Sequence, residues 1–201
     1  MMRYLDSKAK RCRAVGVNLY GNAKFDRLLA RGANPPGEHG NKKHKLSDYG
    51  EHLKEKQKIR WTYGASEKQF VRAYEEASRA KAATGTVLLQ LLERRLDNVV
   101  YRSGLFASRD QARQIVSHGH VLVNGTRLNV ASARLNPGDE ITFKEKSHSL
   151  IKSFSESNQS IVPQWLEVNK TPLRIKFLAV PEREDLDQTF RENLVVEYYS
   201  R

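Results

Sequence analysis

Residues 95–128, RLDNVVYRSGLFASRDQARQIVSHGHVLVNGTRL, change from a helical pattern to a strand pattern within one short stretch. The first part predicts a helix over residues 96–103, and a Ser-x-x-Gln capping box opens a second helix over residues 108–117. The Asn-Gly pair at 124–125 then predicts a tight hairpin between two short strands. Helices followed by antiparallel strands indicate an α+β fold.

The flanking sequence adds further elements on both sides. Asn-Pro-Gly-Asp at 136–139 predicts a turn that leads into a strand at 140–144. Upstream, apolar spacing and capping residues predict four helices, over residues 7–15, 47–62, 66–81 and 86–94. Downstream, the pattern predicts a weak helix at 150–160, a short helix at 182–193 and a strand or extended segment at 194–199.

Two arginines lie near the start of the helix predicted at 108–117. Arg109 and Arg113 are four residues apart and therefore share one face of that helix. The unpaired N–H groups and the dipole at a helix start favour an anion. Beside a β-turn, this arrangement suits recognition of an RNA backbone by its shape. A solvated helix face is the alternative, and charge spacing alone narrowly favours it.

Positive charge is concentrated in the first third of the chain. The 201 residues carry 35 Lys and Arg against 23 Asp and Glu, a formal net charge of +12, and residues 1–60 hold 15 basic and 6 acidic side chains. Residues 16–50 are poor in apolar side chains and rich in Gly and Pro, so they cannot offset their own ordering entropy. Such a segment is either a flexible tail or becomes ordered against a polyanion.

Composition excludes several classes of protein. Cys12 is the only cysteine, so an internal disulfide and a cysteine-based zinc site are both excluded. No apolar stretch approaches the ~20 residues that span a bilayer. The first thirty residues contain no apolar core of a secretory signal. These features predict a cytosolic protein with a polyanionic partner.

The sequence contains no constellation typical of an enzyme. Glycine spacing at 32–37 matches a phosphate loop, but a Glu-His pair follows where such a loop needs Lys and Ser or Thr. His118 and His120 have no third residue at metal-ligand spacing. Asp97 lies among arginines, which favours an ion pair over a general base. We therefore expect no catalytic residue, no metal and no cofactor.

Residues 95–125 closely resemble the S-four RNA-binding module, an αL-type fold of two helices packed on a small β-sheet. The resemblance rests on RLDNVVYR at 95–102, SRDQARQIVSHGH at 108–120 and VNG at 123–125. Several unrelated classes of protein carry this module, so by itself it implies only RNA binding.

Further motifs narrow the family. They are RY at 3–4, PGEHG at 36–40, LSDYG at 46–50, EKQK at 55–58, YG at 63–64, RRLDN at 94–98, PER at 181–183 and YSR at 199–201. In this order, and over essentially the whole chain, they resemble the family of bacterial-type small-subunit ribosomal protein four.

That resemblance implies a structural protein and not an enzyme. It implies early binding to the 5′ domain of small-subunit (16S-type) ribosomal RNA, which nucleates assembly of the subunit body. Contact with small-subunit protein S-five would bear on decoding accuracy, and the chain would help line the channel through which messenger RNA enters. The implied location is the cytoplasm, or the stroma or matrix if an organelle encodes the chain. No membrane partner and no homo-oligomer are implied.

The resemblance also implies three parts. Residues 1–45 form a basic extended segment that faces ribosomal and messenger RNA. Residues 46–93 form a mostly helical, discontinuous domain that residues 172–201 complete, which would explain the apolar residues near the chain's end. Residues 94–171 form a domain that contains the RNA-binding module at about 95–157.

Two sets of contact residues follow from matching the family's motifs. The candidates for ribosomal RNA are Arg3, Tyr4, Lys8, Lys10, Arg13, Lys58, Arg60, Gln69, Arg72, Arg95, Asn98, Arg102, Arg109, Arg113, His118 and Asn124. The candidates for the path of messenger RNA are Lys42, Lys43 and Lys45. The chain departs from many relatives at Asp6-Ser7, where they have Gly-Pro, and it lacks the four cysteines of the zinc-binding relatives.

Two other functions share the expectation of RNA binding. An RNA-modifying enzyme could carry the module as an appendage, but the remaining residues offer no catalytic constellation. A free RNA chaperone would be shorter and would lack the long helical part. The match over the whole chain favours the ribosomal protein.

Overall fold

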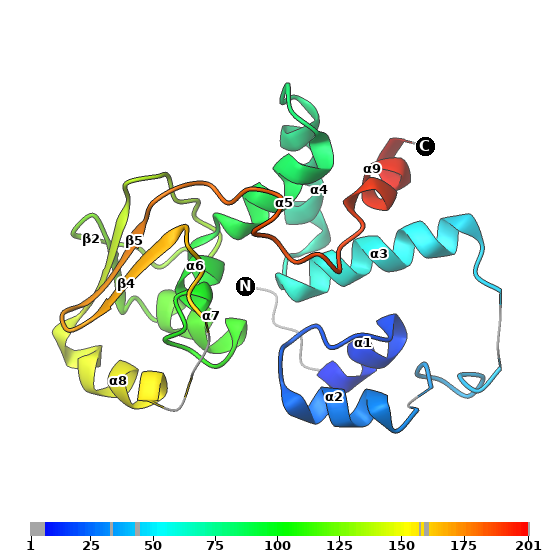
Figure 1. Cartoon of the computed structure of the whole chain (residues 1–201), viewed down its shortest axis with the longest axis horizontal. Helices are drawn as coiled ribbons and strands as arrows, with labels where there is room; N and C mark the ends of the chain where they lie inside the picture. Colours follow the sequence, from blue (N-terminus) through cyan, green and yellow to red (C-terminus); the bar gives the residue numbers. More distant parts are fainter. Residues whose placement is uncertain (1–6, 33, 43–44, 157, 159–160, 201) are drawn as a thin grey trace. The chain divides into compact units, whose positions relative to one another are not determined.

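The computed structural model describes residues 7–32, 34–42, 45–156, 158 and 161–200 (Figure 1). It combines helices with a five-stranded antiparallel sheet, which confirms the predicted α+β class. The chain divides into two compact units: unit 1 consists of Met1–Gly85 and Asp187–Arg201, and unit 2 of Thr86–Leu186. Within the described ranges, no helix combines the length and the apolar character that crossing a membrane requires.

Unit 1 begins with two short helices, α1 (Lys8–Val15) and α2 (Ala23–Ala30). Cys12 and Val15 of α1 form a small buried cluster with Leu19, and Trp61 packs against it. Burial raises the pKa of the Cys12 thiol, so this cysteine is an apolar packing group and not a reactive thiolate. The basic N-terminal segment therefore has a small core of its own, which its composition did not indicate.

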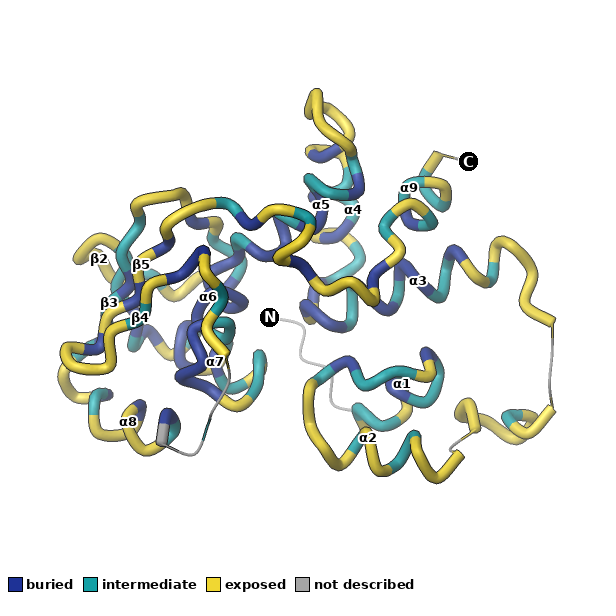
Figure 2. The backbone as a smooth tube through the Cα atoms, viewed as in Figure 1, coloured by how far each residue is buried: buried dark blue, intermediate teal, exposed yellow. Residues whose placement is uncertain are grey.

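Helix α2 was not predicted from the sequence. Its first turn is stabilised by Asn22, whose side chain accepts a hydrogen bond from the backbone N–H of Lys24. None of its residues is fully buried, and Figure 2 shows exposed and half-buried positions along its whole length. Phe25, Leu28 and Leu29 are the half-buried positions and lie at helical spacing, a signal that could have indicated this helix.

The rest of unit 1 is built from α3 (Asp48–Thr62), α4 (Glu67–Ser78) and α9 (Glu192–Ser200). Ser47 caps α3 by accepting from the N–H of Gly50, and Ser66 with Gln69 forms the predicted capping box of α4. Helix α9 lies beside α3 (Figure 1). The end of the chain thus returns to the helices near its start.

The prediction of a strand or an extended segment at 194–199 was wrong, because these residues belong to α9. A run of six mostly apolar residues is ambiguous between strand and buried helix, and packing decides the outcome. Here Val195 is fully buried and Tyr199 lies against Tyr74, with 4.5 Å between the ring centroids. Helical spacing of four residues places both side chains on the face that meets the other helices of unit 1.

The prediction of a short helix at residues 182–193 was also wrong, because only the last two of these residues are helical. Asp185 accepts a hydrogen bond from the N–H of Glu182, and Asp187 accepts one from the N–H of Thr189. Such local contacts between Asp side chains and the backbone compete with helix formation. The segment therefore runs as successive turns.

Glu67 connects α4 to both neighbouring helices. Its carboxylate accepts from Lys56 of α3 at 2.5 Å and from the Tyr199 hydroxyl of α9 at 3.1 Å. Burial raises the pKa of Glu67, but the hydrogen bond and charge of Lys56 outweigh this effect and hold the pKa below its ordinary value. Burial and the adjacent Glu67 carboxylate raise the pKa of the Tyr199 hydroxyl, which therefore remains a donor.

Unit 2 holds most of α5 (Thr84–Glu93), then α6 (Leu96–Arg102), α7 (Arg109–Ser117), the 3-10 turn Glu145–Ser147 and α8 (His148–Glu156). Its strands are β1 (Val121–Val123), β2 (Thr126–Arg127), β3 (Glu140–Phe143), β4 (Leu166–Lys170) and β5 (Leu173–Phe177). The sheet order is β2-β1-β3-β5-β4, and every described pair is antiparallel. Asn124 and Gly125 both have positive φ, which confirms the predicted hairpin turn.

One apolar core holds unit 2 together. Leu96, Val99 and Val100 of α6 pack with residues of α7 and with the inner face of the sheet. Strand β5 alternates regularly, with Ile175 and Phe177 buried and the basic side chains between them exposed. Figure 2 shows that α6 is buried over most of its length, and the turn that follows it, residues 103–106, is buried as well.

The chain passes from unit 1 to unit 2 after residue 85 and returns to unit 1 after residue 186. The domain boundaries expected from the sequence lie after residues 93 and 171. The difference arises because α5 and strand β5 contribute to unit 2. The division into three parts with distinct partners remains a prediction about function.

Candidate nucleic-acid interface

Unit 2 carries a set of polar side chains that we call the arginine network. Its members are Glu93, Asp97, Asn98, Arg95, Arg102, Arg109 and Arg113. They come from the end of α5, from α6 and the residue that precedes it, Arg95, and from the first half of α7. All four arginines of the network and Asn98 were predicted from the sequence as contacts for RNA, and the structure brings them together.

Asp97 is one of two buried carboxylates in the network, with 3% of its side chain exposed. Its carboxylate accepts hydrogen bonds from Arg95 Nε at 3.1 Å and Nη2 at 3.0 Å, and from Arg113 Nε at 2.7 Å. Arg113 Nη2 lies 2.5 Å from the same carboxylate in an ion pair. Two guanidinium groups thus share one carboxylate. Arg95 meets it through two N–H groups, one to each oxygen, which is the planar, bidentate geometry that arginine favours. The predicted ion pair at Asp97 is confirmed.

Glu93 is the second carboxylate, and its side chain is fully buried. It accepts from Arg102 Nε at 3.1 Å and Nη2 at 2.7 Å, and from Asn98 Nδ2 at 2.5 Å. The Oδ1 atom of Asn98 in turn accepts from Arg109 Nε at 2.9 Å. Arg109 also lies over the ring of Tyr101, 4.4 Å from its centroid.

The arginines of the network differ in exposure. Side chains of Arg102 and Arg113 are 29% and 17% exposed, and Arg109 is half-buried. Arg95 and Asn98 are buried, at 6% and 2% exposure. Their polar atoms are held inside the unit, so we reinterpret these two residues as supports for the others and not as contacts for RNA.

The start of α7 adds backbone donors near the network. Ser108 caps the helix by accepting from the N–H of Gln111, and Arg109 and Arg113 follow on one face. The positive end of the helix dipole and two guanidinium groups therefore lie in one region. This arrangement favours an anionic ligand such as a phosphodiester.

The hairpin supplies the remaining candidates of unit 2. Asn124 is exposed, but its amide donates to Asp139 Oδ1 at 2.8 Å and accepts from the N–H of Glu140 at 2.9 Å. It therefore fixes the turn against β3. His118 is exposed at the end of α7, where its ring lies 6.2 Å from that of His120. Within the described ranges, no group of three potential metal ligands exists.

Arg127 is a basic residue that the sequence analysis missed. It is exposed on β2, and its guanidinium lies so close to Gly119 that a Cβ there would come within 2.3 Å of it. Gly119 also has φ +72°, which disfavours any other residue. The Asn-Gly hairpin folds β2 back onto β1 and could have indicated this proximity to α7.

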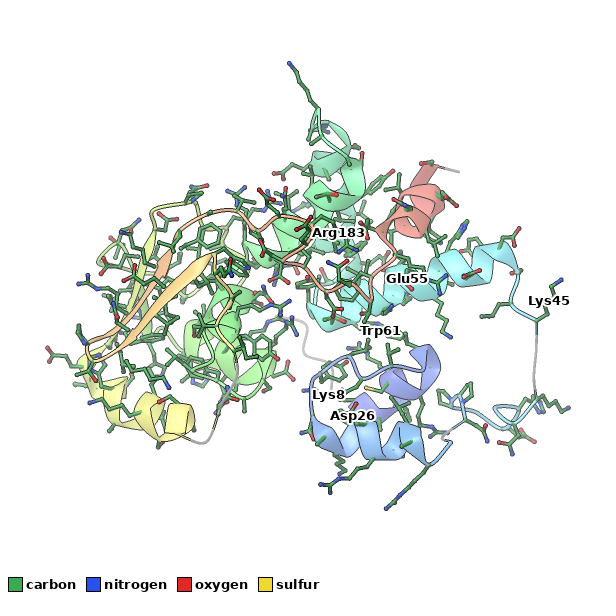
Figure 3. The ribbon with its side chains drawn as sticks, in the orientation of Figure 1. Lys8, Asp26, Lys45, Glu55, Trp61 and Arg183 are labelled. Carbon is green, nitrogen blue, oxygen red and sulfur yellow. The ribbon has the colours of Figure 1, made fainter. Side chains whose placement is uncertain are left out.

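Unit 1 presents its candidates separately. Lys10, Gln69, Arg72, Lys42 and Lys45 are exposed, and Figure 3 labels Lys45 in the segment before α3. Gln69 is also part of the α4 capping box. Arg3, Tyr4 and Lys43 lie outside the described residues.

Four other candidates in unit 1 have protein partners. Lys8 lies 4.9 Å from the ring centroid of Tyr20, and Arg13 donates to the carbonyl of Asn34 at 2.7 Å. Arg60 pairs with Glu67 at 3.0 Å.

Lys58 is buried at 6% exposure and donates to Glu55 and to the carbonyl of Thr189. Figure 3 shows Glu55 on α3, near the segment that leads into α9. Because the ammonium group is held inside unit 1, we reinterpret Lys58 as a support for the return of the chain.

Comparison with known proteins covers the whole chain. The family model described as "Ribosomal protein S4/S9 N-terminal domain" matches residues 3–93, and the one described as "S4 domain" matches residues 94–141. A protein named "Small ribosomal subunit protein uS4" from Thermoanaerobacter sp. (strain X514) is 48% identical over 209 residues, covering 100% of both chains. Proteins of the same name from Gloeobacter violaceus and Magnetococcus marinus are 48% and 46% identical, again over 100% of both chains.

Proposed function

Because this chain belongs to the uS4 family of small ribosomal subunit proteins, we propose that it is a structural constituent of the small subunit that binds 16S-type ribosomal RNA. The family is structural, and the chain is not an enzyme. The observation that carries the proposal is the arginine network beside the start of α7. Asp97 and Glu93 hold the guanidinium groups of Arg95, Arg113 and Arg102, and Asn98 holds that of Arg109.

Arginines held in position by the protein are suited to contact with phosphate. Binding to RNA is dominated by contacts with the phosphate backbone, and each neutralised phosphate releases counterions. A flexible arginine loses side-chain entropy when it binds, whereas a guanidinium already held by a carboxylate loses less. Arg102 and Arg113 are held by carboxylates, and Arg109 is held by the amide oxygen of Asn98. All three are partly exposed, so they are the contacts that we propose for unit 2.

The remaining proposed contacts are the exposed or half-buried basic and polar residues. They are Lys8, Lys10, Arg13, Arg60, Gln69, Arg72, His118 and Asn124, with Arg127 added from its position beside α7. Lys42 and Lys45, which are exposed, together with Lys43, are proposed to face messenger RNA where it enters the subunit.

The finer role follows from the similarity to uS4 proteins over the full length. We propose early binding to the 5′ domain of the ribosomal RNA, nucleation of the subunit body, and contact with small-subunit protein S-five that bears on decoding accuracy. The proposed location is the small subunit in the cytoplasm, or in an organellar stroma or matrix if the gene is organellar. One copy per subunit is proposed, with no membrane partner.

Stoichiometry in purified small subunits tests this proposal. Subunits from the source organism are washed at high salt, and the amount of this chain is measured by quantitative mass spectrometry against other small-subunit proteins. We expect about one copy per subunit, because a structural constituent resides there permanently. A small fraction of a copy that the salt wash removes would instead indicate a free RNA chaperone or an enzyme with an appended RNA-binding module.

A further inference from the structure

Glu93 lies outside the stretch matched by the S4 domain model, which begins at residue 94. Its side chain is nevertheless fully buried, and it accepts hydrogen bonds from Arg102 and Asn98 of the arginine network. An isolated buried carboxylate is strongly unfavourable, so such a group persists only when donors surround it. The donors here are Arg102, through two N–H groups, and the amide of Asn98.

Asn98 carries the influence of Glu93 to a second arginine. Its Nδ2 donates both to the Glu93 carboxylate at 2.5 Å and to the Glu93 backbone carbonyl at 3.1 Å. A carboxylate can only accept hydrogen bonds, so the amide must turn its NH₂ toward Glu93 and its oxygen away. That oxygen accepts from Arg109 Nε at 2.9 Å.

One carboxylate therefore sets two guanidinium groups on neighbouring helices. Arg102 at the end of α6 is held directly, and Arg109 at the start of α7 is held through Asn98. Arg109 also makes a cation–π contact with the face of the Tyr101 ring. Asp97 sets Arg113 independently, so the two carboxylates act on different arginines.

We propose that Glu93 is a positioning residue for RNA binding, which sets Arg102 and Arg109 for contact with phosphodiester groups of the ribosomal RNA. The RNA-binding unit thus begins one residue before the module that its family model defines, at the last turn of α5. This inference rests on the proposed function, because the ligand is the same RNA.

The test compares salt dependence of binding to the 5′ domain RNA for the unmodified chain and for Glu93→Gln. The slope of log K against log salt counts neutralised phosphates, at about 0.7–0.9 per contact. We expect Glu93→Gln to lower affinity at least about tenfold and to reduce the slope by roughly 0.7–1.8, as the loss of one or two contacts requires. Glu93→Asp, which keeps the charge but shortens its reach, is the second variant if Glu93→Gln does not fold.

Glu55→Gln is the matched control. Glu55 is also a buried carboxylate, with 7% exposure, but it holds Lys58 and the N–H of Arg191 inside unit 1. Its replacement is expected to lower the melting temperature while leaving the slope unchanged. A loss of slope equal to that of Glu93→Gln would show a general effect of destabilisation and would overturn the inference.

A second measurement separates positioning from general structural support. In a protein that already carries Arg102→Ala and Arg109→Ala, adding Glu93→Gln is expected to have no further effect on affinity, because its targets are gone. An additional loss of the same size as in the unmodified chain would overturn the inference. If the unmodified chain shows no preference for 5′ domain RNA, the proposed function fails as well; if it does and both Glu93 variants match it, only this inference fails.

Discussion

Replacing Asp97 by Ala is expected to lower the free energy of unfolding of unit 2 by about 3–5 kcal/mol, the usual cost of breaking a buried ion pair from one side. Only 3% of the Asp97 side chain is exposed, and its carboxylate accepts three hydrogen bonds from Arg95 and Arg113 and forms ion pairs with both. Without it, the guanidinium of Arg95 remains buried with no anion to balance it. Arg113 loses the group that holds it beside the start of α7.

The two tryptophans allow this loss to be assigned to one unit. Trp61 belongs to unit 1 and Trp165 to unit 2. In a Trp61→Phe background, the fluorescence of Trp165 during denaturant unfolding reports unit 2 alone. Asp110→Ala is the matched control, since Asp110 is exposed on α7 and its removal costs at most about 1 kcal/mol. Equal losses for the two variants would contradict the structural role assigned to Asp97.

Replacing Val195 by Asp is expected to lower the free energy of unfolding of unit 1 by about 4 kcal/mol or more, because it buries a carboxylate without a partner. Val195 is fully buried on the face of α9 that meets α3. Displacing α9 would also remove Tyr199 from Glu67. The expected result is loss of the whole helical unit and not only of its last helix.

Asn193→Asp is the control for Val195→Asp, because it adds the same charge two residues earlier at an exposed position. An acidic residue in the first turn of α9 is favoured by the helix dipole, so this variant is expected to be neutral or slightly stabilising. Trp61 fluorescence in a Trp165→Phe background reports unit 1, and hydrogen exchange of α3 amides locates the opening. Unchanged protection of α3 in Val195→Asp would show that unit 1 does not need α9.

Elements with strong local signals were predictable from the sequence. The caps at Ser47, Ser66 and Ser108 and the Asn-Gly hairpin act through neighbouring residues, so they are visible without tertiary structure. The prediction of a strand or extended segment at 194–199 was wrong. The helical conformation of these residues depends on packing against α3, and no local sequence pattern contains that information.

The candidate site was predictable in residue type but not in geometry. Sequence spacing placed Arg109 and Arg113 on one face of a helix, and it indicated an ion pair at Asp97. It could not show that Arg95 and Asn98 are buried, because their burial depends on contacts among α5, α6 and α7. Glu93 carried one signal that could have been used, a single acidic residue ending an apolar helix.

The most direct test of shape-specific recognition is a binding titration with the 5′ domain of small-subunit ribosomal RNA. An unrelated structured RNA of equal length serves as competitor, at two salt concentrations. Recognition by the held arginines predicts a large preference for the 5′ domain that survives the higher salt. Equal affinity for both RNAs, falling together as salt rises, would mean that the net charge of +12 acts as a generic polycation and would contradict the proposed role.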